Sequence, residues 1–445
     1  MGKDRNIIRN IKDTVRNRIW QTEYLSEQQK IEIIEKARGL LHPGKQQKGM
    51  EDDGSFASQY IRQVLQTQCY AENHAVPLSD RQYERHDTDS KLIAYYLTQF
   101  CPNAYNDSWW GKGITEWNNV SKSQPQYLGH YQPRLPGELG YYDLRLDENI
   151  ERQVELAKLY GIYGFDFYYY WFDGKRLLEG PLNRYIANKD IDFPFALCWA
   201  NESWTKQWFG RSDEVLMYQN PSVESYRQFI VDIAPYLCDE RYITVKDRKL
   251  LTIYKPFQVP EPEQTIAYWR QYMRDNYDIE LYLVASIGVY EHLERMDYLA
   301  VGYDALSEFA CGPQLEYMRR ITAEKQFACE KFVGEIYSYP QLIKDKGYLK
   351  RNARKMYRAI SPMWDNTPRR MNASLILDGS TPELFRSWLE DIMQENKERG
   401  DLDDDIIFIN AWNEWGEGAY MEPDAYWGYG YLEAMRQALE KLRTR

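Results

Sequence analysis

Eight short apolar runs constrain the fold of this chain more than any other feature of its sequence. Amphipathic stretches with helical spacing lie between them, and this alternation is typical of βα units around a parallel sheet. The sequence therefore predicts strands at 92–97, 163–169, 193–199, 250–255, 281–286, 304–309, 359–364 and 406–412.

Two of the intervening stretches carry clear helix signals. Asp147 precedes a helical pattern that Gly161 ends. Later in the chain, Thr381 occupies an N-cap position with Pro382 in the first turn behind it. These signals place helices between the predicted strands.

Eight strand–helix repeats fit a closed (β/α)8 barrel, the TIM barrel. The sequence predicts enlarged loops after the first strand, at 98–145, and after the sixth, at 310–335. A doubly wound open sheet is the alternative, but the glycine-rich phosphate loop that usually follows its first strand is missing. We therefore assign residues 91–445 to an α/β barrel domain.

Residues 1–90 differ from the rest of the chain. Apolar residues at helical spacing among many charges predict amphipathic helices at 7–20 and 27–41, and a short helix at 60–70. No catalytic motif is found there, so we predict a helical N-terminal extension. The first residues lack the apolar stretch of a signal peptide, and no run approaches the ~18 apolar residues of a membrane span, which predicts a cytoplasmic protein.

Composition narrows the function. The net charge of −11 argues against a nucleic-acid partner. The six cysteines are scattered without a CxxC pair, and the five histidines lack metal-ligand spacing, so neither a metal nor a cofactor is predicted. The chain has 14 Trp, 38 Tyr and 15 Phe, many beside Asn, Asp or Glu. Rings with an apolar face and a polar edge suit a carbohydrate partner.

Polar and aromatic residues recur just past the predicted strands. In a barrel the active site lies at the carboxyl ends of the strands, so these residues are expected to share one cleft. The predicted substrate-binding residues are Tyr95, Trp110, Glu116, Trp117, Asp166, Tyr168, Trp199, Asn201, Glu202, Trp204, Asp365, Asn366, Trp412, Asn413, Trp415 and Glu422.

Glu414 and Glu417 are the predicted catalytic pair. Their spacing would bring both to one face of a helical turn, with Cβ atoms about 5–6 Å apart. Two close carboxylates repel, which raises one pKa and separates them into acid and base roles. Gly416 and Gly418 would permit a tight turn there. The sequence has no GxSxG elbow, Walker loop or dinucleotide fingerprint, which leaves carboxylate cleavage of a glycosidic bond as the favoured chemistry.

Other assignments stay open at this point. Glu202 in "WANESW" could be the acid, with Glu414 or Glu417 as its partner, or a group that binds a sugar hydroxyl. Asp365 could bind hydroxyls or pair with Arg369 or Arg370. Asp166 either points into the cleft or is a buried polar group with its hydrogen bonds satisfied, and Glu422 is either a binding or a structural residue.

Several collinear stretches resemble a known family. "AYYLTQFCPNAYNDSWWGKGITEWNNV", "QPRLPGELGYYDLR", "GFDFYYYWFDGKRLLEGPL", "FALCWANESW", "MWDNTPRR", "STPELFRSWL" and "FINAWNEWGEGAYMEPD" are similar to WbsX-type proteins of bacterial O-antigen and capsule gene clusters. Such proteins are also described as glycoside hydrolase family 99-like. The resemblance runs from about residue 91 to residue 443 and does not cover residues 1–90.

The resemblance implies a (β/α)8 barrel and a carbohydrate substrate. In true family 99 endo-α-mannosidases, one Glu of a Glu-x-x-Glu pair assists the sugar 2-hydroxyl as it attacks its own anomeric carbon. The other Glu is the general acid/base. The matching positions are Glu414 for the assisting base and Glu417 for the acid/base, but the flanking sequence is of the WbsX type, so mannose specificity is not implied.

Three hypotheses follow. The first is a glycoside hydrolase acting on a bacterial polysaccharide or glycan. The second is a glycosyltransferase of O-antigen, capsule or lipopolysaccharide biosynthesis, which would need a site for a nucleotide or lipid-phosphate donor. The third is a non-catalytic glycan-binding protein.

Overall fold

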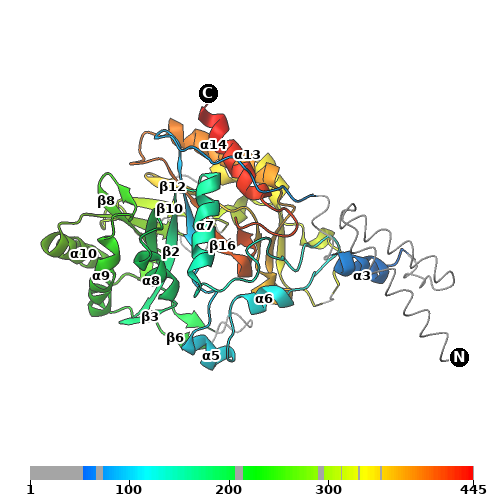
Figure 1. Ribbon diagram of the computed structural model, residues 1–445, viewed down its shortest axis with the longest axis horizontal. Coiled ribbons are helices and arrows are strands. Elements are labelled where there is room, and N and C mark those ends of the chain that lie inside the picture. Colours follow the sequence, from blue (N-terminus) through cyan, green and yellow to red (C-terminus); the bar gives the residue numbers. More distant parts are fainter. Residues whose placement is uncertain are drawn as a thin grey trace, which may run out of the picture. The chain divides into compact units, whose positions relative to one another are not determined.

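The computed structural model describes residues 54–66, 74–205, 214–288, 295–311, 313–328, 331–350 and 353–443 (Figure 1). The chain divides into two compact units, residues 1–62 and residues 63–445. The helices predicted at 7–20 and 27–41 lie outside the described residues. Helix α3 (Phe56–Gln66) overlaps the short helix predicted at 60–70, and the helical domain over residues 1–90 stays a prediction.

Eight parallel strands close into a barrel, which confirms the predicted fold. In order around the barrel, β1 pairs with β2, then β4, β8, β9, β10, β12 and β15 follow, and β15 pairs back to β1. Their bounds are β1 Lys91–Tyr96, β2 Gly164–Phe172, β4 Phe195–Trp199, β8 Arg248–Ile253, β9 Leu281–Ile287, β10 Ala305–Glu308, β12 Met356–Ile360 and β15 Ile406–Ile409.

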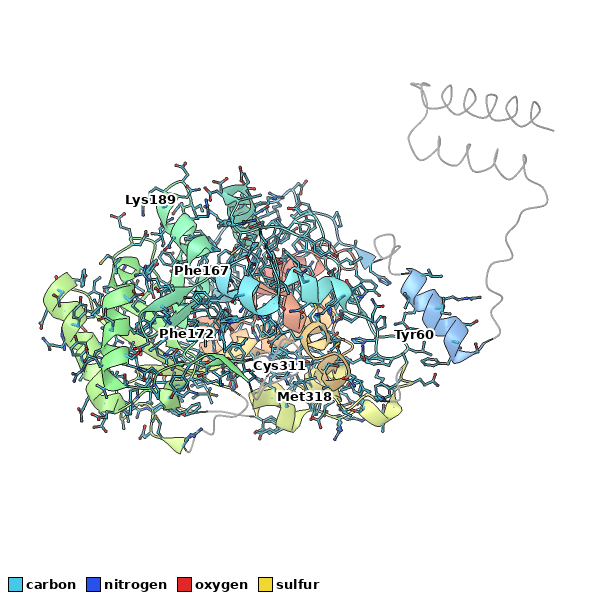
Figure 2. The ribbon with its side chains drawn as sticks, turned by 90° about the horizontal axis from the view of Figure 1, so that it is seen from below. Tyr60, Phe167, Phe172, Lys189, Cys311 and Met318 are labelled. Atoms are coloured by element: carbon cyan, nitrogen blue, oxygen red, sulfur yellow. The ribbon has the colours of Figure 1, made fainter. Side chains whose placement is uncertain are left out.

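The strands form the buried core of the barrel. Nearly all of their side chains are buried, as expected when helices cover a parallel sheet. Phe167 on β2 is buried and packs on Tyr185 of a covering helix, whereas Lys189 lies at the surface (Figure 2).

Helices surround the barrel, and two of them test the predicted helix signals. Helix α7 (Asp147–Tyr160) ends at Gly161, which has a left-handed φ of 95°. Asp147 lies inside its first turn rather than before it, where a carboxylate favours the positive end of the helix dipole. Helix α13 (Pro382–Glu398) begins as predicted, with the Thr381 side chain accepting a hydrogen bond from the backbone N–H of Leu384.

The remaining helices follow the same alternation. They are α8 Gly180–Ala187, α9 Val223–Leu237, α10 Pro262–Tyr277, α11 Tyr339–Lys344 and α14 Gly430–Arg443. Helices α13 and α14 lie side by side near the C-terminus (Figure 1). Among the described residues, no helix combines the length and the apolar character that a membrane crossing requires.

Each predicted strand differs from the observed one in at least one bound, and the differences at the seventh and eighth strands lie closest to the predicted site. The seventh was predicted at 359–364 but occupies Met356–Ile360. The eighth was predicted to reach residue 412 but ends at Ile409. The residues beyond both strands form short additional pairs instead, namely β13 (Trp364–Asp365) with β14 (Leu375–Asp378) and β16 (Asn413–Glu414) with β17 (Ala419–Tyr420).

The enlarged loops at the carboxyl ends contain further elements. The loop after β1 contains α5 (Ala104–Trp110) and α6 (Trp117–Lys122). A hairpin of β5 (Trp204–Thr205) and β6 (Val215–Met217) follows β4, and β11 (Glu335–Ser338) pairs with β14 after β10. The segment before β1 is extended and belongs to the barrel unit, since Val76 forms backbone hydrogen bonds with Trp427 and Tyr429.

Candidate active site

A cavity of about 660 Å³ opens at the carboxyl ends of the barrel strands. Its wall combines aromatic rings with charged and amide side chains, as expected for a sugar site. The main lining side chains are Gln99, Asn106, Trp110, Tyr168, Tyr170, Glu202, Trp204, Tyr254, Lys255, Phe309, Cys311, Trp364, Asn366, Arg369, Arg370, Glu414 and Glu417.

Glu414 and Glu417 enter this cavity from one short turn. The β16–β17 hairpin follows β15, and the 3₁₀ turn Trp415–Glu417 forms its tip. Gly418 closes the turn in a left-handed conformation, with φ at 59°. The predicted helical turn is therefore present, and it brings both carboxylates to the same cavity.

Arg369 binds both of these carboxylates and a third one. It belongs to the short helix α12 (Thr367–Arg370). Its Nη2 lies 2.7 Å from Glu414 Oε1, its Nη1 lies 2.9 Å from Glu417 Oε1, and its Nε lies 3.0 Å from Glu116 Oε1. A planar guanidinium with five N–H donors suits such a three-way contact. Three distant parts of the chain therefore meet at one cation.

The charges of this cluster favour retention of a proton. Burial raises the pKa of Glu414 well above its usual range, the Arg369 guanidinium lowers it, and the charges of Glu417 and Glu116 raise it again. Burial likewise raises the pKa of Glu417, against the opposing effect of Arg369. Full ionisation would leave the buried Glu116 and Glu414 and the partly exposed Glu417 with one guanidinium. The pair is therefore suited to holding and exchanging a proton.

Gly416 lets Glu116 approach the turn. A Cβ atom at this position would lie 2.0 Å from Glu116 Oε1 and 2.7 Å from Arg369 Nε. Both atoms belong to the ion-paired cluster, so moving either one disturbs the contact between Glu116 and Arg369. The glycine is required by this close contact rather than by a left-handed backbone.

The Gly416→Ala substitution should therefore destabilise the fold. Overpacking of this kind costs about 1–3 kcal/mol in a packed interior, and we expect a matching fall in the free energy of unfolding in urea. Gly400→Ala is the control, because nothing lies within 4 Å of a Cβ built at that glycine. Equal stability of the Gly416→Ala variant and the wild type would show that the contact can relax.

Glu202 and Lys255 form another charged part of the cavity wall. Burial raises the pKa of Glu202, Lys255 lowers it, and the charge of Glu417 raises it, so Glu202 senses the charge of the turn at residues 415–417. Asn201 is buried behind them. Its Oδ1 accepts the Lys255 backbone N–H at 2.7 Å, and its Nδ2 donates to the Lys255 carbonyl at 2.9 Å. Asn201 thus supports the wall rather than lining it.

Asp166 and Tyr95 lie inside the barrel, outside the lining of the cavity. Asp166 is fully buried, and neither of its carboxylate oxygens reaches a partner with hydrogen-bond geometry in the described part of the chain, although Thr252 lies beside it. Burial raises the pKa of Asp166 to about 8. Of the two predicted alternatives for Asp166, the buried polar group is the one observed. The satisfied hydrogen bonds that were predicted with it are not found.

The Asp166→Asn substitution tests this protonation state. The folded pKa of about 8 exceeds the ordinary value of 3.8, so stability from this group is lost as the pH rises between those values. The loss is about 1.4 kcal/mol per pH unit. Chemical unfolding between about pH 5 and pH 8 should show a steeper fall for the wild type than for the variant, by up to about 4 kcal/mol. Parallel curves would contradict a neutral Asp166.

Several predicted binding residues stand behind the cavity wall. Trp199 stacks on Phe229 with ring centroids 3.6 Å apart. Trp412 packs against Phe165, and Asn413 bonds through its amide to both the N–H and the carbonyl of Leu97. These side chains hold strand ends together.

A second buried group supports the turn of residues 415–417 from behind. Trp415 stacks on Tyr420 with centroids 3.7 Å apart, and Trp117 packs against it. The Trp415 indole N–H donates to Glu422 at 2.6 Å, and Gln153 donates to the same carboxylate at 2.6 Å. Burial outweighs these donors and raises the pKa of Glu422 to about 7.

The predicted residues thus fall into two groups. Trp110, Tyr168, Glu202, Trp204 and Asn366 line the cavity together with the predicted catalytic pair, Glu414 and Glu417. Outside the lining stand Tyr95, Glu116, Trp117, Asp166, Trp199, Asn201, Asp365, Trp412, Asn413, Trp415 and Glu422.

Sequence reasoning missed several lining residues. Lys255 ends the predicted fourth strand, so the rule that found the other rim residues could have included it. Cys311 (labelled in Figure 2) lies in the loop after β10, which carried no signal. Burial raises the pKa of the Cys311 thiol to about 12, which excludes a thiolate there at neutral pH. Arg369 was considered only as the partner of one carboxylate.

The carboxylate cluster is held by the guanidinium. Across the described ranges, no group of three or more His, Cys, Asp or Glu side chains is arranged to hold a metal ion. The polar groups that line the cavity are amides, hydroxyls and charged side chains.

Comparison with known proteins adds a family. A family model described as "Glycosyltransferase WbsX" matches residues 92–435. Two curated relatives from strains of Xanthomonas campestris pv. campestris, each named "Uncharacterized protein WxcX", are 42% identical over 350 residues. The match covers 79% of this chain and 50% of each relative, so the chain spans about half the length of the curated relatives it matches.

Solved structures share the fold. One described as "Glycoside hydrolase-like protein" is 15% identical with a TM-score of 0.51, and the match covers 84% of this chain and 98% of that one. The GH99 endo-alpha-mannosidase from Bacteroides thetaiotaomicron is 14% identical with a TM-score of 0.50, and the match covers 80% of this chain and 98% of that one. At these identities the likeness is one of fold.

Proposed function

The chain belongs to the WbsX family of carbohydrate-active enzymes, and from this premise we propose that it hydrolyses a glycosidic bond in a bacterial polysaccharide or glycan. The observation that carries the proposal is the convergence of Glu414 and Glu417 on one cavity, where a single arginine binds both. Two carboxylates of unlike protonation state are the groups that glycosidic cleavage requires.

Glu417 is the proposed acid/base and Glu414 the proposed assisting base. In the first step Glu414 accepts the proton of the sugar 2-hydroxyl, whose oxygen attacks the anomeric carbon. Glu417 protonates the leaving oxygen as its bond to that carbon breaks. In the second step Glu417 takes a proton from water, and the water oxygen attacks the anomeric carbon as the bond between that carbon and the 2-oxygen breaks. Glu414 returns its proton to the released 2-oxygen. Atoms and charges balance over the two steps, and the configuration is retained.

The charges of the cluster keep a proton on the pair. Burial raises the pKa of both glutamates, and the charge of Glu116 raises both further, so a proton is available to the leaving group. Arg369 stabilises the negative charge that remains, and it can do so in both steps because it touches both carboxylates.

Aromatic side chains around the pair suit a sugar ring. Trp110 and Trp204 line the cavity, and Tyr168 and Tyr170 line it from β2. Their rings can cover the C–H faces of a sugar while the polar groups of the wall bind its hydroxyls.

Glycosyl transfer is the second candidate function. The description of the family favours it, and so does the presence of Lys255 and Arg370 in the cavity wall. Cations of this kind bind the phosphates of activated donors. A transferase would place such a donor in the same cavity.

Product analysis separates the two functions. Purified O-antigen and capsular polysaccharides would be incubated with the protein, with and without added sugar nucleotides, and new reducing ends would be counted. The hydrolase predicts new reducing ends without any nucleotide. Products that form only with a sugar nucleotide would support the transferase, and binding without either product would support a non-catalytic glycan-binding protein.

A further inference from the structure

Asp365 is buried outside the cavity lining and receives hydrogen bonds from two sides. Its Oδ1 accepts the backbone N–H of Thr367 at 3.0 Å and the Thr367 hydroxyl at 2.5 Å. Its Oδ2 lies 2.7 Å from Nε2 of His130 and accepts from Gln132 at 2.7 Å. The side chain of Asp365 is fully buried. Its environment is built to hold a carboxylate in one orientation.

Residues of the loop between β1 and α7 keep the Asp365 carboxylate ionised. His130 Nδ1 accepts the backbone N–H of Gln126 at 3.0 Å, so the Nε2 atom carries the proton that points at Asp365. Arg134 lies 3.7 Å from the same carboxylate oxygen. Burial works against the charge, but His130 and Arg134 outweigh it and lower the pKa of Asp365 below its usual range.

The other side of Asp365 leads to the reacting pair. Thr367 begins helix α12, and Arg369 lies two residues further on in the same short turn. The helix has four residues, so its direction depends on how its first residue is held. Its N-cap residue, Asn366, makes no side-chain capping bond and instead accepts the N–H of Leu375 at 2.7 Å. The Asp365 carboxylate supplies the contact that fixes Thr367.

Asp365 also adjoins the catalytic turn directly. A Cβ atom on Gly418 would lie 2.9 Å from the Asp365 carbonyl oxygen. Asp365 therefore packs against the residue after Glu417 and, through Thr367, fixes the helix that carries Arg369. Asp365 therefore contacts the segments that carry both partners of the ion pair, Glu417 and Arg369.

We propose that Asp365 is a positioning residue, which through Thr367 sets the placement of the Arg369 guanidinium between Glu414 and Glu417. The effect on turnover rests on the proposed function of that pair, but the effect on their protonation does not. Because Arg369 lowers the pKa of both glutamates, a displaced guanidinium would let both values rise.

The test compares Thr367→Val with Thr367→Ser. Valine keeps the shape of threonine but loses the hydroxyl, whereas serine keeps the hydroxyl. The protonation of Glu414 and Glu417 would be followed against pH by difference infrared spectroscopy of the carboxyl groups, with Glu414→Gln and Glu417→Gln assigning the bands. We expect the glutamate midpoints to rise by about one pH unit in the valine variant and to stay unchanged in the serine variant.

Other charged side chains also influence the pKa values of Glu414 and Glu417. Glu414 faces Arg369, Glu417 and Glu116. Glu417 faces Arg369, Glu116 and Arg370, and its charge acts on Glu202. Thr367→Val changes none of these groups, so a shift of both midpoints in one direction indicates movement of Arg369.

Gln132→Met provides a second and independent variant. Gln132 donates a hydrogen bond to Asp365 but belongs to the loop between β1 and α7 rather than to α12. A change in the titration of the two glutamates would therefore pass through Asp365. We expect a smaller rise of the same midpoints. Wild-type titration in both variants, even with a lower melting temperature, would overturn the proposal and leave Asp365 a purely structural role. Unchanged turnover in the glutamine variants of Glu414 and Glu417 would instead overturn the proposed function.

Discussion

Glu417→Gln is expected to slow cleavage of the natural glycan by about 10²- to 10⁴-fold, because a glutamine cannot give a proton to the leaving oxygen. Glu414→Gln is expected to cause a loss of similar size, since its amide cannot accept the 2-hydroxyl proton. Both substitutions keep the volume of the side chain. Initial rates of reducing-end formation would measure the loss, with the surface variant Glu155→Gln as control.

The two variants should differ with an activated substrate. A good leaving group needs no proton, so an aryl glycoside of the cleaved sugar should restore much of the rate of the first step in Glu417→Gln, measured as release of the aryl alcohol in the first turnover. The rate of Glu414→Gln should stay low, because attack by the 2-hydroxyl still requires a base. The opposite pattern would exchange the two roles, and full activity of both variants would contradict the catalytic assignment.

Arg369→Met is expected to destabilise the protein by about 3–5 kcal/mol near neutral pH, because it removes the cation from the carboxylate cluster of Glu116, Glu414 and Glu417, of which the first two are buried. Urea unfolding would measure the loss. Arg152→Met is the matched control, since Arg152 also pairs with two carboxylates, Glu138 and Glu155, but does so at the surface. There the expected change is about 0–1 kcal/mol.

The loss in Arg369→Met should depend on pH with a definite sign. The pKa values of Glu414 and Glu417 are already raised in the folded protein and would rise further without the guanidinium. A group whose pKa is raised on folding loses stability as the pH rises from its ordinary range through the raised value. The variant should therefore be closest to the wild type in mild acid and fall behind it as the pH increases. A constant difference would indicate lost packing rather than unpaired charge.

The barrel could be predicted from the sequence because its signal is repeated and local. Each strand is a short apolar run, and each helix has its own periodicity, so no single misjudged element changes the fold. The seventh strand shows where prediction from apolar runs misplaces the bounds of a strand. Pro362 has no N–H to offer a sheet, whereas the true strand contains Arg358, a buried charge that pairs with Glu308 and Glu395. A charged residue in a buried strand can be recognised only with its partners.

The candidate site was predictable only in part, for a related reason. Position just past a strand found the cavity-lining Glu202 and Glu414, but it could not tell which way a side chain points. Trp199 lies at a strand end and yet packs outward on Phe229. The pairing of Arg369 with Glu116 joins residues far apart in the chain, and no sequence spacing records it.

A crystal structure of the Glu417→Gln variant with its glycan bound would test the central claim most directly. We predict a sugar ring against the aromatic wall, with its anomeric carbon beside the turn of residues 414–417. The leaving oxygen should face residue 417, and the 2-hydroxyl should lie about 3 Å from the Glu414 carboxylate. A glycan whose anomeric carbon lies beside Glu202 and away from Glu414 would contradict the account.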